Sequence, residues 1–231
     1  DTLQDRFTYT VSDGKGGTDT AILTLNIAGA NTPPVAQPDF ATTNEDTPVT
    51  FPVLGNDSDP EGDPLTVTGA TVDPAQGSVV VNPDGTLRFT PAPNFNGPAQ
   101  ITYTIDDGKG GTTTAVVTVN VALVNDAPVA RNDVDGLVKT DTVPATGNLI
   151  TNPAGLDTDL EGDTLSVSAI GATPVAGATV ISGLFGTLTI QPNGEYSYVQ
   201  DVANPAVVAL APGDTLQDRF TYTVSDGKGG T

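Results

Sequence analysis

The sequence of 231 residues contains no cysteine, histidine, methionine or tryptophan. The absence of cysteine excludes a disulfide framework, and without cysteine and histidine the usual ligands of zinc, copper and iron are missing. Lysine and arginine number only 8 against 28 acidic residues, which gives a formal net charge of −20. Such a polyanion repels nucleic acid and anionic membranes, so cations bound through oxygen are the natural partners.

Long hydrophobic runs are also missing. No apolar stretch approaches the length of about 18 residues that crosses a bilayer, and no signal peptide stands at the N-terminus. We therefore expect no direct membrane insertion. Both features would also be missing from a segment taken from the middle of a longer protein, so their absence does not bear on export.

An exact internal repeat is the most informative feature that is present. The first 18 residues, DTLQDRFTYTVSDGKGGT, are identical to residues 214–231, and the motif TYTxxDGKGGT occurs once more at 102–112. Identity at this level indicates recently duplicated units, here with a period of 213 residues that holds two unequal domains. We interpret the chain as a slice of a longer array.

Apolar residues alternate with polar ones at the spacing of β-strands. Ile101, Tyr103 and Ile105 fall on one face of such a strand, and the DGKGG turn then leads into a second strand of the same kind. With 26 glycines and 19 prolines, helix is nearly excluded. The sequence predicts an all-β chain of sandwich domains with about seven strands each. In the first complete domain the strands are expected near 35–42, 48–54, 65–71, 77–81, 86–90, 99–106 and 112–122.

These patterns divide the chain into three parts. Residues 1–30 are expected to be the last strands of a preceding domain, 31–123 one sandwich, and 124–231 a second sandwich that lacks its last strand. Residues 18–27 supply such a strand after the first copy of the shared motif. A strand of one molecule could therefore complete the next, head to tail. The alternative is a boundary that simply falls inside a continuous polymer.

Two acidic loops carry the chemistry of the sequence. Asp57-Ser-Asp59-Pro-Glu61-Gly62-Asp63 recurs as Asp157-Thr-Asp159-Leu-Glu161-Gly162-Asp163. Alternating carboxylates before a glycine can turn several oxygens toward one point, which suits Ca²⁺ better than Mg²⁺. The twelfth position holds Thr68 or Ser168 instead of glutamate, so neither loop is an EF-hand. The alternative is a solvated acidic turn.

Several motifs together resemble a known family. The linker with Asn125, Asp126 and Pro128, the glutamate at Glu45, the acidic loops and the Asp-Gly turn are similar to cadherins. NEDTPVTFPVLGNDSDPEGDPLTVTGA, NPDGTLRFTPAPNFNG and FTYTVSDGKGGTDTA resemble bacterial cadherin-like and VCBS-type tandem repeats of large secreted, RTX-type, biofilm-associated adhesins. The first domain resembles the cadherin-like type, and the second, with GTLTIQPNGEYSYV, the VCBS type. The implied fold is a Greek-key, cadherin-like or immunoglobulin-like sandwich in an elongated array.

The resemblance implies a Ca²⁺ site at each junction between domains. The ligands implied for the two junctions, together with the last acid of each loop, are Asn31, Asp57, Asp59, Asp63 and Asp107 for the first, and Glu45, Asn125, Asp126, Asp157, Asp159, Asp163 and Asp226 for the second. The linker into the first domain departs from the family, because Thr32 stands where an acid is expected. That junction is expected to bind more weakly.

The resemblance also implies a function. A structural extender of a bacterial cell-surface adhesin, rigidified by Ca²⁺, would lie outside the cell and have neighbouring repeats of its own chain as partners, with head-to-tail or lateral self-association possible. The alternative is a sandwich that binds a ligand, either carbohydrate or another copy of itself. An enzyme is not expected, because the paired acids lie in exposed loops that offer no apolar pocket to raise a pKa.

Overall fold

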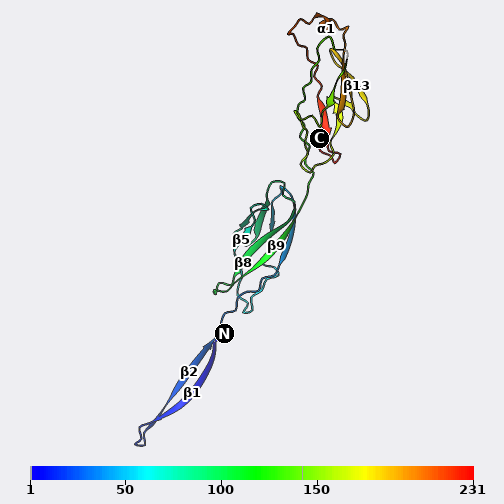
Figure 1. The fold of residues 1–231 in the computed structure, drawn as a ribbon. Helices are drawn as coiled ribbons and strands as arrows, with labels where there is room; N and C mark the ends of the chain where they lie inside the picture. The colour runs from blue at the N-terminus through cyan, green and yellow to red at the C-terminus, as the bar shows by residue number, and fades with distance from the viewer. Residues whose placement is uncertain (1, 142) are drawn as a thin grey trace. The chain divides into compact units, whose positions relative to one another are not determined.

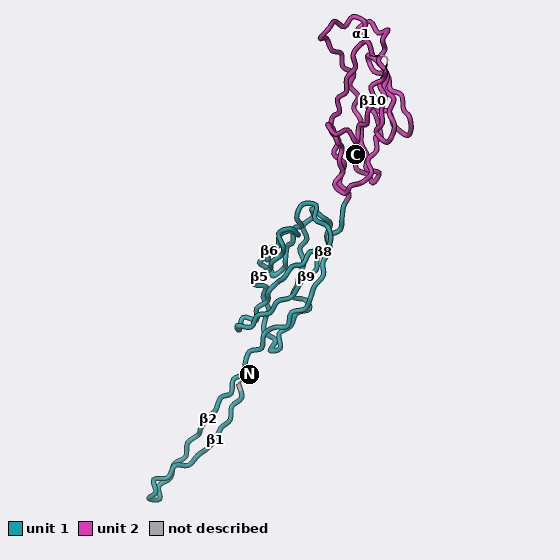
Figure 2. Tube along the Cα trace, in the orientation of Figure 1, with its two compact units in different colours: residues 1–124 teal, residues 125–231 magenta. Residues whose placement is uncertain are grey.

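The computed structural model describes residues 2–141 and 143–231. The chain divides into two compact units, residues 1–124 and 125–231 (Figure 2). This division falls one residue after the boundary that the sequence predicts. Nearly all regular structure is β-strand, and the one described helix has five residues (Figure 1). Among the described residues no helix is long and apolar enough to cross a membrane.

Unit 1 contains a sandwich of two sheets. One sheet has the order β3-β9-β8-β5 and the other has the order β4-β7-β6. The first strand, β3, pairs in parallel with the last strand, β9, and the other pairs are antiparallel, which is a Greek-key arrangement. The strands are β3 (Asp39–Asn44), β4 (Val49–Phe51), β5 (Thr66–Val72), β6 (Gly77–Val81), β7 (Leu87–Pro91), β8 (Gly97–Asp106) and β9 (Thr112–Ala122).

The core of this sandwich follows the predicted alternation. Ile101, Tyr103 and Ile105 of β8 have no exposed surface, and Leu87 and Phe89 of β7 face them from the other sheet. Two strands begin or end differently from the prediction because prolines lack the N–H donor of a sheet. β3 begins only after Pro38, and β4 ends before Pro52.

Unit 2 is a second sandwich with the sheets β10-β15-β14-β13 and β12-β11-β16. Its core is formed by Val167, Ile170, Leu188 and Ile190 together with partly buried aromatic rings. The helix α1 (Pro205–Ala209) begins at Asn204, whose side chain accepts a hydrogen bond from Ala206 N. The strands are β10 (Ala145–Asn148), β11 (Ser166–Ile170), β12 (Thr173–Pro174), β13 (Thr179–Ser182), β14 (Gly186–Ile190), β15 (Glu195–Gln200) and β16 (Tyr222–Ser225).

A two-stranded hairpin precedes the sandwich of unit 1. It consists of β1 (Thr2–Ser12) and β2 (Thr18–Ala28), which pair antiparallel with Ser12 opposite Thr18 (Figure 1). All its described side chains from residue 3 to 28 are exposed. The hairpin therefore has no hydrophobic core of its own.

Candidate cation sites

Each acidic loop is folded by its second aspartate. Asp59 Oδ1 accepts hydrogen bonds from Glu61 N at 2.9 Å and from Asp63 N at 3.1 Å, and Asp159 Oδ1 does the same with Glu161 N and Asp163 N. The glycine inside each turn has a positive φ, 81° at Gly62, which a residue without Cβ adopts without strain. One oxygen of the second aspartate is thereby used for the turn, and the other, Oδ2, is left without a partner.

The DGKGG loops bring a buried aspartate next to each linker. Asp107 is 2% exposed, and its Oδ1 accepts hydrogen bonds from Lys109 N and Gly111 N. Its Oδ2 accepts a hydrogen bond from Asn31 Nδ2 at 2.8 Å. A Cβ at Gly111 would lie 2.1 Å from that oxygen, so the loop requires glycine there. The predicted residues Asn31 and Asp107 are thus in direct contact.

Unit 2 repeats this arrangement. Asp226 is 5% exposed, its Oδ1 accepts hydrogen bonds from the loop N–H groups of Lys228 and Gly230, and its Oδ2 accepts one from Asn125 Nδ2 at 2.6 Å. A Cβ at Gly230 would lie 2.1 Å from Oδ2. Hydrogen bonds to a carboxylate favour its charged form. The Asn125 side chain and then the loop amides therefore lower the pKa of Asp226.

In unit 1 a hydrogen bond from an asparagine likewise lowers the pKa of the buried aspartate, and this can be tested. The Asn31 side chain is the largest influence that lowers the pKa of Asp107, and loop N–H groups add to it. Replacing Asn31 with alanine should raise the pKa of Asp107, measured by the NMR titration of the carboxyl carbon. Because the folded pKa is below the unfolded one, the stabilisation is present above the unfolded pKa and is lost as pH falls through the folded pKa. Asp13, which has the same loop but no asparagine partner, is the internal control. An unchanged pKa of Asp107 would contradict the claim that the Asn31 side chain lowers it.

The first aspartate of each loop faces a tyrosine of its own sandwich. Asp57 Oδ2 lies 3.1 Å from the Tyr103 hydroxyl, which also lies 2.9 Å from Asp39 Oδ2. In unit 2 the Tyr222 hydroxyl lies 3.0 Å from Asp133 Oδ2 and 3.5 Å from Asp157 Oδ1. These aspartates therefore tie the loop to the sheet.

Burial governs the ionisation of these groups. It raises the pKa of Asp157, with a smaller rise from the charge of Asp133, while hydrogen bonds from Arg131 N and Tyr222 oppose both. In unit 1 burial likewise raises the pKa of Asp39. An unpaired buried carboxylate is costly, so a cation beside Asp157 would favour its charged form.

Exchanging Tyr222 for phenylalanine removes the hydroxyl that serves these acids. We expect the free energy of unfolding of unit 2 to fall by about 1 to 3 kcal/mol, because the acceptors around this hydroxyl, which are the Arg131 carbonyl and the carboxylates of Asp133 and Asp157, share its single proton and lose it. Tyr9 is the same residue in the identical sequence copy, but it is exposed in the hairpin. Tyr9→Phe should therefore leave denaturant unfolding unchanged, and equal effects of the two exchanges would refute the role of the Tyr222 hydroxyl.

Unit 2 contains a group of buried oxygens that have no hydrogen-bond partner among the described atoms. They are Asn125 Oδ1, Asp126 Oδ2, Asp157 Oδ2, Asp159 Oδ2 and Asp163 Oδ2. Ligand atoms of Asp159, Glu161 and Asp163 lie within 4.8 Å of one another. Five of the predicted site residues thus have a buried side-chain oxygen that accepts no hydrogen bond from the described residues.

A positive side chain already approaches this cluster. Lys228 Nζ lies 2.6 Å from Asp163 Oδ1, and the contact raises the pKa of the lysine. The DGKGG motif predicts a turn and indicates no role for this lysine. The acidic cluster accounts for its position, since one cation lowers the mutual repulsion of the carboxylates.

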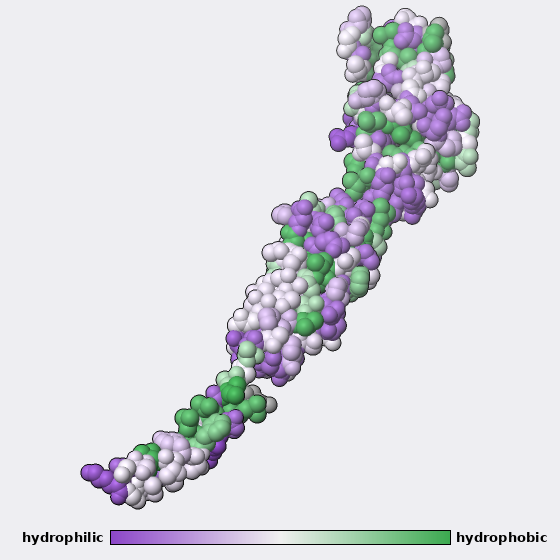
Figure 3. All heavy atoms as spheres, turned by 60° about the horizontal axis from the view of Figure 1, so that its bottom comes forward, coloured by the Kyte–Doolittle hydropathy of each residue, from purple (hydrophilic) through white to green (hydrophobic). Residues whose placement is uncertain are grey.

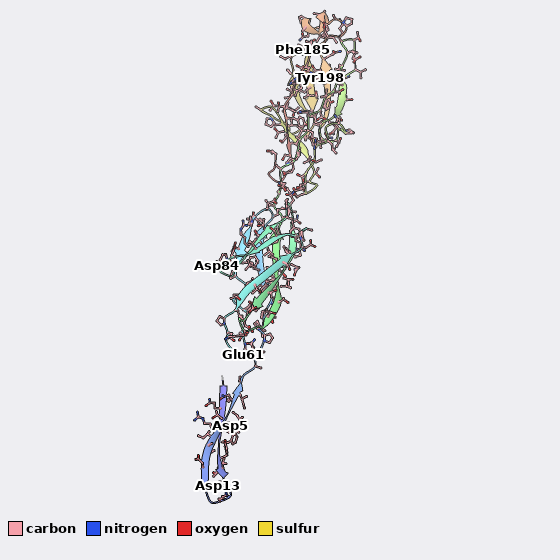
Figure 4. The ribbon with its side chains drawn as sticks, turned by 90° about the vertical axis from the view of Figure 1, so that its left-hand side faces the viewer. Asp5, Asp13, Glu61, Asp84, Phe185 and Tyr198 are labelled. Atoms are coloured by element: carbon pink, nitrogen blue, oxygen red, sulfur yellow. The ribbon has the colours of Figure 1, made fainter. Side chains whose placement is uncertain are left out.

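In unit 1 more of the acidic side chains have hydrogen-bond partners within the unit. Thr32 donates to Glu61 through N at 3.1 Å and through Oγ1 at 2.8 Å, whereas Asp126 in the equivalent place offers Glu161 only its N at 3.3 Å. Asp59 Oδ2 is the one buried side-chain oxygen without a partner in the described part of unit 1. Figure 4 shows Glu61 at one end of this sandwich.

Glu45 lies apart from the acidic loop of unit 1. Its side chain accepts a hydrogen bond from Val124 N, and its N donates to Ala122 O at 2.9 Å. Ala122 is the last residue of β9 and Val124 comes after it, whereas Asp107 precedes that strand. Glu45 is 4% exposed and therefore fixes the chain where it leaves the sandwich. Its part in a cation site stays a prediction.

Three kinds of residue lie at these sites without being predicted from the sequence. Glu61 and Glu161 stand inside the acidic loops but are not proposed as ligands there, although both contact the linker. Asp39 and Asp133 each lie eight residues after the linker asparagine, a shared spacing that could reveal them. Tyr103 and Tyr222 resemble ordinary core residues in an alternating pattern, so nothing in the sequence indicates their hydroxyl contacts.

Comparison with known proteins agrees with this architecture. The family model described as bacterial Ig domain matches residues 31–120, and the one described as bacterial cadherin-like domain matches residues 125–231. The first domain, whose motifs resemble the cadherin-like type, matches the model of the bacterial Ig domain. The VCBS designation of the second domain stays a prediction.

Among characterised proteins, the calcium-binding lectin RapA2 of Rhizobium johnstonii is 29% identical over 106 residues. The match covers 46% of this chain and 44% of RapA2. The chain thus spans less than half of that relative.

Solved structures give weaker likenesses. Protocadherin gammaB7 EC3-6 has a TM-score of 0.42 at 16% identity, covering 96% of this chain and 54% of that chain. An endo-fucoidan hydrolase from glycoside hydrolase family 107 has a TM-score of 0.33 at 20% identity, covering 99% and 33%. Scores this low carry no argument for a shared activity.

The two family matches together cover most of the chain and meet close to the division between the units. The chain is therefore built of one domain that matches the bacterial Ig family and one that matches the bacterial cadherin-like family, which confirms the resemblance to bacterial cadherin-like repeats that the motifs indicated.

Proposed function

We propose that the acidic loops bind Ca²⁺ and that the chain is a structural extender of an extracellular bacterial adhesin. The residues that would hold the ion in unit 2 are Asn125, Asp126, Asp157, Asp159, Asp163 and Asp226. In unit 1 they are Asn31, Asp57, Asp59, Asp63 and Asp107, and Glu45 is a further candidate where the chain leaves the sandwich.

The observation that carries this proposal is the group of partnerless buried oxygens in unit 2. A buried polar atom without a partner costs about 1 to 3 kcal/mol, and more when it is charged. Five such atoms belong to the linker and the acidic loop of unit 2, and within that loop the oxygens of Asp159, Glu161 and Asp163, with Lys228 beside Asp163, indicate a place where positive charge is required. The residues present therefore fit a cation.

The chemistry of the donors favours calcium. All of the candidate ligands are carboxylate or amide oxygens, and the chain has no histidine or cysteine. Ca²⁺ accepts six to eight oxygens in variable geometry, whereas Mg²⁺ demands a regular octahedron. The name of the relative RapA2 describes a calcium-binding protein, which also supports this choice.

Binding at this place would order the connection between the domains. Asn125 and Asp126 are candidate ligands and directly follow Val124, whose N is held by Glu45. Empty carboxylates repel one another. Neutralising them while fixing Asn125 and Asp126 would leave few free backbone torsions in the linker, and we propose that this stiffens an array of such domains into a stalk.

A distance measurement between the two units tests the stiffening. The chain has no cysteine, so Thr102→Cys and Glu195→Cys can each carry a spin label at an exposed position. Calcium should narrow the distance distribution between these labels, and chelator should broaden it. The pair Arg88→Cys and Thr102→Cys lies within unit 1 and should not change. A distribution of equal width with and without calcium would refute the stalk role.

Carbohydrate binding is a second candidate, because the name of RapA2 describes a lectin. Among the aromatic rings that could stack on a sugar, Tyr103 and Phe89 are fully buried, whereas Phe40 of β3 is 78% exposed and Phe7 and Tyr9 of the hairpin are each 51% exposed. A glycan array with the calcium-loaded chain tests this candidate. Binding that is lost in Phe40→Ala but kept in Thr42→Ala on the same strand would support it, and no bound glycan would oppose it.

A further inference from the structure

The strand β6 forms an open edge of its sheet in unit 1. Its neighbour in the sheet is β7, and among the described residues its outer main-chain groups have no hydrogen-bond partner. Such an edge can pair with another strand, and proteins commonly prevent this with charge, proline or a bulge. β6 has none of these: residues 77–81 are Gly-Ser-Val-Val-Val in a regular ladder, and Val80 is 57% exposed.

Two other edges of the same sandwich are protected. β4, at the opposite edge of the sheet that contains β6, has three residues and is followed by Pro52. β5, an edge of the facing sheet, has a bulge between Val67 and Gly69. Short length, proline and bulges all discourage pairing with a further strand. The openness of β6 is therefore particular to this strand and is not shared by these two edges.

Unit 2 contains the same pair of strands with this edge covered. Residues 186–198 align with residues 77–89 without a gap, so β14 is the counterpart of β6, and Ile190 lies opposite Tyr196 as Val81 lies opposite Leu87. On its other side β14 pairs antiparallel with β13 (Thr179–Ser182), which has no charged residue. The counterpart of β6 thus accepts an antiparallel, uncharged strand rich in β-branched residues.

The connection before β6 is too short to supply such a strand in unit 1. β5 ends at Val72 and β6 begins at Gly77, whereas the chain between β11 and β14 in unit 2 is long enough to form β12 and β13. Figure 3 shows only scattered apolar side chains on the face of the unit 1 sandwich that it draws. Recognition at β6 would therefore depend on main-chain groups and a few valines, and its occupant has to come from outside this connection.

We propose that β6 of one molecule pairs antiparallel with β6 of a second copy of this chain. Identical edges meet about a two-fold axis, so one contact satisfies both edges and the assembly closes as a dimer. The axis passes at Val80, which lies opposite Val80 of the second copy. Val79 and Val81, which pack against the core, then lie opposite one another across the pair and continue the inner face of the joined sheet.

The charge of the chain favours this place for contact between copies. Each copy has a net charge of −20, so surfaces rich in acid repel one another. Residues 74–83 have no charged side chain. With the axis at Val80, Asp84 of one copy falls level with Gln76 of the other and not with Asp73. The pairing does not depend on the cation sites or on the stalk role, so its tests are made in chelator.

Sedimentation velocity of the whole chain, at an ionic strength that screens the net charge, tests the pairing. The average mass should rise with concentration from the monomer toward the dimer. Val80→Glu should keep the chain monomeric, because it places two like charges opposite each other. The control is Thr50→Glu, which should still dimerise, since Thr50 and Val80 are both exposed and lie on either side of Arg88. Monomers of the unmodified chain up to roughly 1 mM, where specific binding is weak, or equal behaviour of the two variants, would overturn the proposal.

Cross-linking tests the register and the occupant. The chain has no cysteine, so Val80→Cys introduces a single thiol that lies opposite its own copy and should give a covalent dimer on oxidation. Thr50→Cys, at the other edge of the same sheet, should give little. The outer edge of β13 is the rival occupant, and a mixture of Val80→Cys with Val180→Cys tests it. Equal dimer yields from Val80→Cys and Thr50→Cys, or a mixture that forms mainly the heterodimer, would overturn the proposal.

Discussion

Saturating calcium should raise the melting temperature of unit 2 by roughly 10 to 20 °C relative to chelator. A ligand at 100 times its dissociation constant stabilises the folded state by about 2.7 kcal/mol, and a domain of this size gains about 4 to 8 °C per kcal/mol. The physical cause is the group of buried oxygens that the protein leaves without partners. Scanning calorimetry of the whole chain, with the transition of unit 2 assigned by variants, measures the shift.

One exchange separates the cation effect from ordinary folding. In Asp159→Asn the remaining carbonyl oxygen still accepts from Glu161 N and Asp163 N, so the turn is kept, while the charged Oδ2 is lost. Without calcium this variant should melt at the same temperature as the unmodified chain or higher, because repulsion is reduced. With calcium it should lose most of the shift.

A charge-matched control completes this experiment. Glu195→Gln removes one exposed negative charge from β15 of the same unit, and it should keep the full response to calcium. An equal loss in Glu195→Gln and Asp159→Asn would mean that calcium acts on the overall charge and not at the acidic loop. A melting temperature that is indifferent to calcium would refute the site.

The substitutions Asp126→Thr and Thr32→Asp should change the calcium affinities of unit 2 and unit 1 in opposite directions. Asp126→Thr removes a buried carboxylate oxygen without a partner from unit 2, and calcium affinity there should fall by about 10- to 100-fold, since affinity follows the number of charged ligands. Thr32→Asp should raise the affinity of unit 1. It replaces the hydroxyl that now satisfies Glu61 by a carboxylate that needs a cation.

Isothermal titration calorimetry with calcium measures both exchanges. Thr32→Ser keeps the hydroxyl beside Glu61 and is the matched control for unit 1, so its affinity should stay that of the unmodified chain. If Thr32→Asp binds no better than Thr32→Ser, the difference between the two linkers is not what sets the affinity. If Asp126→Thr binds as tightly as the unmodified chain, Asp126 is not a ligand.

Much of the fold could be predicted from the sequence because strands repeat with a period of two residues. The alternation at Ile101, Tyr103 and Ile105 marks one face, and that face is the core. The DGKGG turn also predicts that its two flanking strands pair. The ends of β3 and β4 are less predictable, because Pro38 and Pro52 remove donors at positions that the alternation alone treats as strand.

The site could be predicted only in part. Spacing alone groups the acids of a loop, and the structure does bring Asp159, Glu161 and Asp163 together. The spacing of residues in the sequence cannot show that Asp57 and Asp157 face tyrosines of their own sheets, because that depends on how the loop packs on the sandwich. The sequence also cannot show that Lys228 contacts Asp163, since a glycine-rich turn does not fix the direction of a long side chain.

A crystal structure of the chain grown with calcium, with anomalous scattering recorded at long wavelength, tests the central claim most directly. The account predicts an anomalous peak in unit 2 bounded by oxygens of Asn125, Asp126, Asp159 and Asp163, at the distance of about 2.3 to 2.6 Å that calcium prefers. A well-ordered acidic loop with only water beside Asp159 and Asp163 at saturating calcium would contradict it.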